Sequence, residues 1–172
     1  SDHGEMLGDH GLVLKGCRFY EGLVRVPLIV SWPGRFQQGV VSDALVELTD
    51  LAPTLYEAAG AQVPYWVQGR SLLPILQGES TEHRDFVRTE FFGAIDFPGQ
   101  THATMYRDHR WKLVSYHGKA LYEMYDLLND PWEHDNLADD PHHQEKKWDL
   151  IGKSFDATAN AHMPSAPRVM PF

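Results

Sequence analysis

The sequence predicts an α/β protein in which a strand and helices come first and a small antiparallel sheet with a terminal helix follows. Residues 24–32 form an apolar, β-branched run, which is typical of a buried strand in a parallel sheet. A helical pattern follows between residues 49 and 60. Four short strand patterns then crowd into residues 86–127, which favours a small antiparallel sheet over further strand–helix repeats.

The first part of the chain begins as a loop, because glycines interrupt any helical period through residue 22. The run V-R-V-P-L-I-V-S-W is the predicted strand, and its proline marks the strand's start. Asp50 is expected to cap a helix that ends at Gly60, and Ser71 a short helical turn over L-L-P-I-L-Q. The face expected to pack on the sheet comprises Leu51, Leu55, Ala58 and Ala59.

In the second part, the predicted strands are F-V-R-T-E-F-F, A-T-M-Y-R, R-W-K-L-V-S-Y and L-Y-E-M-Y-D-L. A polar helix is expected from about His142, with an apolar stripe of Trp148, Ile151 and Phe155. Aromatic residues at strand spacing are interpreted as core rather than as a stacking platform: Trp111, Tyr122, Tyr125 and Trp132.

The composition excludes several classes of protein. The net charge is −9 with no basic stripe, so nucleic acid is a poor candidate partner. The longest apolar runs fall well short of a membrane span. A single cysteine, Cys17, excludes an internal disulfide framework. The compartment cannot be read from the sequence, because it opens inside a dense motif with no initiator methionine; this opening predicts that part of the protein lies upstream.

Chemistry-bearing residues gather in the first fifteen positions, S-D-H-G-E-M-L-G-D-H-G-L-V-L-K. Adjacent Asp2 and His3 can offer an oxygen and a nitrogen to one metal ion. Lys15 adds a compact positive charge within reach of an anionic ligand. The alternative is a glycine-rich turn with an Asx cap and a stray histidine. The stretch predicts half of a metal-dependent hydrolytic site.

Five motifs in collinear order resemble the C-terminal half of the sulfatase family, within the alkaline-phosphatase superfamily. They are S-D-H-G-E-M-L-G-D-H-G with the following F-Y-E-G-L-V-R-V-P, then L-T-D-L-A-P-T-L-Y-E-A-A-G, Q-G-R-S-L-L-P-I-L, R-D-H-R-W-K-L-V and L-Y-E-M-Y-D-L-L-N-D-P-W-E-H-D-N-L-A. The resemblance implies the end of an alkaline-phosphatase-like α/β sandwich over residues 1–82. It also implies a four-stranded antiparallel subdomain with a terminal helix over residues 83–172.

The same resemblance implies that an N-terminal half is missing from this chain. That half would hold the paired aspartates of the metal site and the C-x-P-S-R segment whose cysteine becomes formylglycine, the nucleophile. Cys17 is followed by Arg18 and Phe19, so it does not match that segment and is expected to be an unmodified packed thiol. The chain by itself is therefore expected to be inactive.

Site residues are carried over where they match the family's motif. Asp2 and His3 match its metal pair, and Lys15 matches a lysine that contacts the transferring sulfuryl group or the nucleophile; the alternative for Lys15 is a solvated surface side chain. The family implies Ca²⁺, whereas the imidazole of His3, in place of a common asparagine, favours Mn²⁺ as the alternative. The histidine form resembles the branch of choline sulfatases and phosphonate monoester hydrolases.

Further residues have weaker functional predictions. His10 could act as an acid–base group, although bracing of the loop by hydrogen bonding is the favoured interpretation. His102, after the loop from residue 92, could contact substrate, and otherwise is a solvated loop histidine. Glu21 and Arg25 are expected to form a structural ion pair or backbone clamp beneath the site.

The predicted function is therefore that of a fragment of a metal-dependent sulfatase, acting on a small-molecule or carbohydrate sulfate ester. The alternative chemistry is hydrolysis of phosphonate monoesters or phosphodiesters on the same scaffold. A different class also remains open, namely a non-catalytic truncated product.

Overall fold

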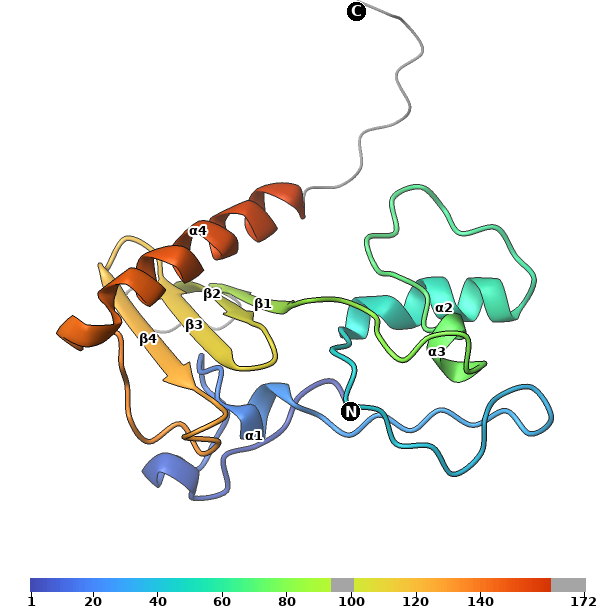
Figure 1. The fold of residues 1–172 in the computed structure, drawn as a ribbon, viewed down its shortest axis with the longest axis horizontal. Coiled ribbons are helices and arrows are strands. Elements are labelled where there is room, and N and C mark those ends of the chain that lie inside the picture. The colour runs from blue at the N-terminus through green and yellow to red at the C-terminus, as the bar shows by residue number, and fades with distance from the viewer. Residues whose placement is uncertain (94–100, 162–172) are drawn as a thin grey trace, which may run out of the picture. The chain divides into compact units, whose positions relative to one another are not determined.

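The computed structural model describes residues 1–93 and 101–161 (Figure 1). Two compact units emerge from the contacts within the chain. The first combines Ser1–Leu28 with Asp85–Ala157, and the second combines Ile29–Arg84 with the chain from Thr158 on. The first 28 residues thus group with the sheet, so the compact units do not follow the linear order of the chain. The predicted domain division at residue 82 stays a prediction about the whole protein.

A four-stranded antiparallel sheet forms the centre of the first unit, in the order β1-β2-β3-β4. The strands are β1 (Val87–Phe92), β2 (His102–Arg107), β3 (Trp111–Tyr116) and β4 (Leu121–Asp126). All four lie where the short strand patterns of the sequence predict them. The β2–β3 turn is closed by Asp108, whose Oδ1 accepts from the backbone N–H groups of Arg110 at 2.9 Å and Trp111 at 2.7 Å.

The sheet buries both of its faces. On one face lies the terminal helix α4 (Gln144–Asn160), preceded by the short turn η3 (Pro141–His143) (Figure 1). Its Leu150 and Ala157 pack against Leu113 and Met124. On the other face, Phe19 from the N-terminal segment packs against Ala103, Met105, Val114 and Tyr116. Because side chains alternate along a strand, neighbouring residues of β3 serve the two different faces.

The stripe predicted for the terminal helix is wrong at two of its three positions. Trp148 and Phe155 are 65% and 72% exposed, whereas Ile151 packs against the core. The buried side of α4 is the row Lys147, Leu150, Ser154 and Ala157. Lys147 belongs to that row because its aliphatic stem lines apolar surface while its Nζ lies 4.8 Å from the ring centre of Tyr122. Trp132, predicted as core, is 69% exposed.

Residues 24–32 do not form the predicted parallel strand. Val24 ends the short helix α1 (Glu21–Val24), the residues after it have no regular secondary structure, and Ile29 is 91% exposed. A strand exists only where a neighbour completes its hydrogen-bond ladder. Within residues 1–93 and 101–161, strand pairing is confined to β1–β4.

The second unit contains the predicted helix as α2 (Leu51–Ala58), preceded by the turn η2 (Leu48–Asp50), and the short α3 (Leu73–Leu76). Gly60 has a φ of 69°, which suits the left-handed end of a helix. The predicted apolar face is wrong: Pro53 and Thr54 are buried, and Leu55 is 69% exposed. Thr54 faces inward because its hydroxyl donates to the Asp50 carbonyl and accepts from the Leu72 N–H.

Candidate functional site

The predicted metal pair lies exposed at the start of the first unit. The carboxylate Oδ2 of Asp2 is 3.9 Å from Nε2 of His3. Nδ1 of His3 lies 2.9 Å from the carbonyl oxygen of Gly4. A carbonyl can only accept, so a hydrogen on Nδ1 makes this bond, and in the neutral ring Nε2 is left with a free lone pair. That tautomer is the one that ligates metal through Nε2.

Asp2 is also in the form that binds cations. Its own backbone N–H holds the pKa of the Asp2 carboxyl below its ordinary value. The pair therefore presents a carboxylate oxygen and an imidazole nitrogen side by side.

The backbone that carries this pair is held against α1. The N–H of Gly4 donates to the carbonyl of Leu23 at 2.8 Å. A Cβ added at Gly4 would lie 1.9 Å from the carbonyl oxygen of Gly22. Only glycine allows this close approach, so the glycine after Asp2 and His3 is a packing requirement.

His10 lies at a tight turn in the loop that follows, in the short η1 (Asp9–Gly11), with a φ of 49°. Its ring stacks on Tyr20 with centres 3.9 Å apart, and His134 lies 5.3 Å away in a tilted arrangement. The bracing function expected for His10 is thus provided by ring stacking rather than by hydrogen bonding. An acid–base function for His10 stays a prediction.

Lys15 points toward the same loop. Its Nζ lies 3.7 Å from Oε1 of Glu5, and both side chains are partly exposed. The other carboxylate oxygen of Glu5 is buried without a hydrogen-bond partner. Lys15 thus provides positive charge on the loop that carries Asp2 and His3, and its contact with a reacting group stays a prediction.

His102 begins β2 and is exposed. Its ring meets Phe92 edge to face with centres 5.6 Å apart, and its carbonyl accepts from the His117 N–H at 2.8 Å. Most of the preceding loop lies outside the described residues. Substrate contact by His102 therefore stays a prediction.

A buried ion cluster is the main feature that sequence reasoning missed. Lys112 has no exposed surface, and its Nζ lies 2.7 Å from Glu133 and 2.7 Å from Glu21. Arg107 lies 3.4 Å from Glu21 as well. The predicted Glu21–Arg25 ion pair is thus replaced by ion pairs with the sheet, although the Arg25 backbone N–H donates to the Glu21 carbonyl at 2.9 Å. A lysine at an inward-facing position of β3 was the available signal.

The two carboxylates of this cluster titrate in opposite directions. Burial acts to raise the pKa of Glu21, but Lys112 and Arg107 outweigh it, so this pKa lies below its ordinary value. Burial raises the pKa of Glu133 above its ordinary value despite the same lysine. One lysine shared by two buried carboxylates explains this difference, because it cannot compensate both of them fully.

Arg18 makes a second link between the N-terminal segment and the sheet. Its guanidinium donates to Glu123 at 3.1 Å and to the Tyr116 hydroxyl at 3.2 Å, and Tyr116 itself donates to Glu123 at 2.9 Å. Burial raises the pKa of the Tyr116 hydroxyl, so it remains a donor at neutral pH.

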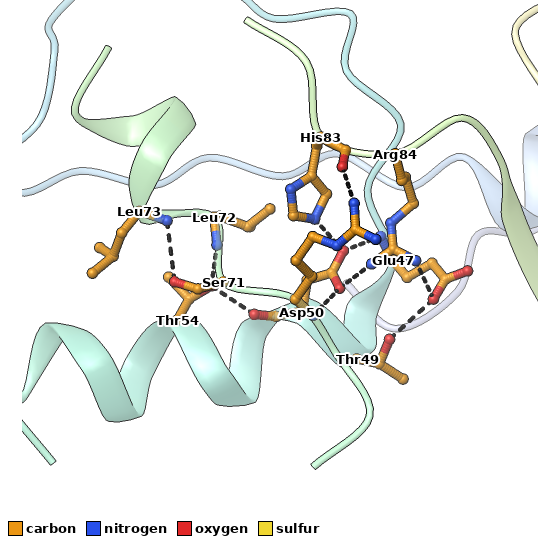
Figure 2. A network of polar contacts seen from close by, with 10 residues as sticks. Glu47, Thr49, Asp50, Thr54, Ser71, Leu72, Leu73, His83 and Arg84 are labelled. Atoms are coloured by element: carbon orange, nitrogen blue, oxygen red, sulfur yellow. Dashed lines mark hydrogen bonds and ion pairs between the residues drawn. The ribbon is translucent and has the colours of Figure 1, made fainter. Parts of the chain in front are cut away.

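In the second unit, Asp50 is the centre of a polar network (Figure 2). The buried carboxylate accepts from the backbone N–H groups of Glu47 at 2.9 Å and Arg70 at 2.8 Å, from His83 at 3.1 Å, and from Arg84. Asp50 was expected to cap α2; its side chain makes no cap bond to that helix, but it completes a capping box with Glu47 at the start of η2 and joins three segments.

Ser71 has the predicted local role, with its hydroxyl accepting from the Leu73 N–H at 3.3 Å (Figure 2).

No three histidine, cysteine, aspartate or glutamate side chains within residues 1–93 and 101–161 group as a metal site. The helices in these same ranges include none that is both long and apolar enough to cross a bilayer.

Similarity to known proteins places the chain among the sulfatases. Residues 8–158 match the family described as "N-sulphoglucosamine sulphohydrolase, C-terminal". The chain belongs to this family, as the motifs predict.

An N-acetylglucosamine-6-O-sulfatase of Bacteroides thetaiotaomicron is 32% identical over 156 residues, which are 88% of this chain and 28% of that protein. A solved structure of a protein in complex with its substrate D-glucosamine-2-N,6-O-disulfate has a TM-score of 0.83 at 30% identity, covering 94% of this chain and 33% of that one. The phosphonate monoester hydrolase of Agrobacterium radiobacter has a TM-score of 0.81 at 30% identity, with coverages of 94% and 34%. The chain thus spans about a third of the length of these relatives.

Proposed function

We propose that this chain is the C-terminal part of a sulfatase that hydrolyses sulfate esters on a carbohydrate. Family membership supports the reaction class. The relatives whose names specify an amino-sugar sulfate, at 32% and 30% identity, support the substrate class.

The observation that carries the proposal is the arrangement of Asp2 and His3. A carboxylate and an imidazole Nε2 lie 3.9 Å apart on a backbone fixed by a glycine contact. The donor set fits a divalent cation, with the mixed oxygen and nitrogen ligands favouring Mn²⁺ while the family favours Ca²⁺. Such a cation, once bound, polarises the sulfuryl oxygens and orients the nucleophile.

The remaining groups of this chain have supporting roles in the proposal. Lys15 stabilises negative charge that builds on the sulfuryl oxygens and the leaving oxygen. The sequence contains no C-x-P-S-R or S-x-P-S-R segment, so we place the formylglycine nucleophile and the other metal ligands in a segment outside these residues. The 172-residue chain alone is then inactive.

The test uses the complete protein that carries this chain, with a chromogenic sulfate ester and added Mn²⁺ or Ca²⁺. Asp2→Ala is expected to lower kcat/KM by about 100-fold, since removing a ligand weakens both metal binding and its geometry. Asp43→Ala serves as the control, because Asp43 is an exposed aspartate far along the chain. Equal activity of the Asp2→Ala variant and the unmodified protein would show that the pair has no part in the reaction.

Hydrolysis of phosphonate monoesters is the second candidate, favoured by His3 and by the similarity to the Agrobacterium hydrolase. The sulfate and phenylphosphonate esters of one phenol share the leaving group, so the ratio of their kcat/KM values separates the two activities. A higher value for the phosphonate supports the second candidate. Turnover of neither ester in the complete protein supports the non-catalytic class.

A further inference from the structure

Lys112 and Glu133 are unusual among the core residues of the first unit because they are charged. Lys112 is fully buried in β3, and Glu133 follows β4 and is 3% exposed. A buried ion cluster is weak support for stability, because desolvation of the charges offsets much of their attraction and apolar residues often serve as well. The cluster instead provides a defined geometry, because hydrogen bonds to charged groups hold their partners in one orientation.

These two side chains hold one short stretch of the N-terminal segment at three atoms. Nζ of Lys112 donates to the Phe19 carbonyl at 2.9 Å and lies 2.7 Å from the Glu21 carboxylate. Oε2 of Glu133 accepts from the Glu21 backbone N–H at 2.6 Å, while its Oε1 accepts from Lys112 at 2.7 Å. The start of α1 is therefore bonded to the sheet through backbone and side chain together.

From α1 the contacts continue directly to the candidate metal pair. The Leu23 carbonyl of α1 accepts from the Gly4 N–H at 2.8 Å, and the Gly4 α-carbon lies against the Gly22 carbonyl. Gly4 in turn accepts the Nδ1–H of His3 through its own carbonyl. Hydrogen bonds joined through the backbone of α1 thus connect Lys112 and Glu133 with the imidazole of His3.

We propose that Lys112 and Glu133 are positioning residues, which set the orientation of Asp2 and His3 through α1. The proposal rests on the proposed function, in which this pair binds the metal. Its physical basis is that metal affinity depends on groups that orient the ligands, even where they touch no metal. The sheet, rather than the loop itself, then supplies the rigidity that the exposed pair lacks.

The experiment measures Mn²⁺ affinity of the complete protein by titration calorimetry, together with the unfolding midpoint without metal. Glu133→Gln removes the charge at nearly constant shape, and is expected to weaken Mn²⁺ binding about tenfold. Leu150→Ala is the control for general destabilisation, because Leu150 packs on the opposite face of the sheet. It is expected to lower the midpoint at least as much and to change the affinity less than twofold.

A metal-free readout accompanies the affinity. In the Glu133→Gln variant the amide of Gly4 is expected to exchange its hydrogen faster than in Leu150→Ala, because α1 is released. If Glu133→Gln does not fold, Glu133→Asp decides in the same assays, since it keeps the charge but draws the carboxylate back by one methylene.

The outcomes separate the two proposals. If Asp2→Ala binds Mn²⁺ as tightly as the unmodified protein, the metal pair itself is wrong. If Asp2→Ala weakens binding but the Glu133 variants match the unmodified protein or merely match Leu150→Ala, the positioning role is wrong.

Discussion

Replacing Gly4 with alanine tests the contact that holds the candidate metal pair. The added Cβ would lie 1.9 Å from the Gly22 carbonyl oxygen, whereas ordinary contacts begin at 3.4 Å, so the two backbones must separate by about 1.5 Å (3.4 minus 1.9). Neither side can rotate away, because both contacting groups are fixed to the main chain. Gly4 does not have a positive φ, so the clash rather than backbone strain is the perturbation.

The size of this shift predicts a large functional effect. Metal sites tolerate ligand displacements of about 0.2 Å, and a misplacement of about 1 Å in a catalytic site lowers rates about 100-fold. We expect Gly4→Ala to reduce kcat/KM of the complete protein at least about 100-fold and to weaken Mn²⁺ binding about tenfold or more. The lost bond to Leu23 costs about 1 kcal/mol of folding free energy and the clash adds to this cost, so thermal unfolding of the variant is measured beside its activity.

The assay compares kcat/KM and the Mn²⁺ dissociation constant with those of Gly152→Ala. Gly152 lies in α4, and a Cβ there meets nothing within 4 Å, so this control adds the same methyl group without a clash. It is expected to bind Mn²⁺ normally and to gain about 0.5–1 kcal/mol in stability. A folded Gly4→Ala variant with normal Mn²⁺ affinity would refute the reasoning that this backbone contact positions the pair.

Two further predictions concern stability. Asp50→Asn places an amide NH₂ among the donors of Arg84, His83 and two backbone N–H groups, so the free energy of unfolding in urea is expected to fall by about 3–5 kcal/mol. Asp43→Asn, at an exposed position, is the control. A fall below about 1 kcal/mol for Asp50→Asn contradicts the prediction. Arg110 donates to Asp126 at 3.0 and 2.7 Å and holds the pKa of that carboxyl below its ordinary value. The folded state therefore favours the ionised Asp126 carboxylate, which stabilises the fold at pH values above its unfolded pKa of 3.8. This contribution to the free energy of unfolding is lost as the pH falls through the lower pKa of the folded state. Thermal unfolding of Asp126→Asn is expected to depend less on pH below about 4 than that of the unmodified protein, and an unchanged acid dependence contradicts this assignment.

Local sequence patterns predicted the secondary structure well where turn residues or a glycine mark the ends of an element. The strands β1–β4 are short runs separated by turn residues, and α2 ends at Ala58, two residues before Gly60, whose positive φ suits the end of a helix. The run at residues 24–32 satisfies the same strand rule yet forms none, because a strand requires a neighbour that sequence composition does not reveal.

Orientation of side chains was predicted less well. The row of α4 that faces the sheet begins at Lys147 rather than Trp148, a difference of one residue that turns two aromatic side chains outward. Hydrophobicity alone favours the aromatic row, but packing against the sheet favours the row that interlocks best, including a lysine whose ammonium lies over the Tyr122 ring.

The sequence by itself determined the family, the order of strands and helices, and the segment that carries Asp2, His3 and Lys15, because these depend on neighbouring residues and short motifs. Only the tertiary structure decided that the Glu21 side chain pairs with Lys112 and Arg107 rather than with the Arg25 side chain. Partners so far apart in the chain meet through the packing of the N-terminal segment on the sheet. That packing depends on all of the surrounding surfaces together, and no local pattern contains it.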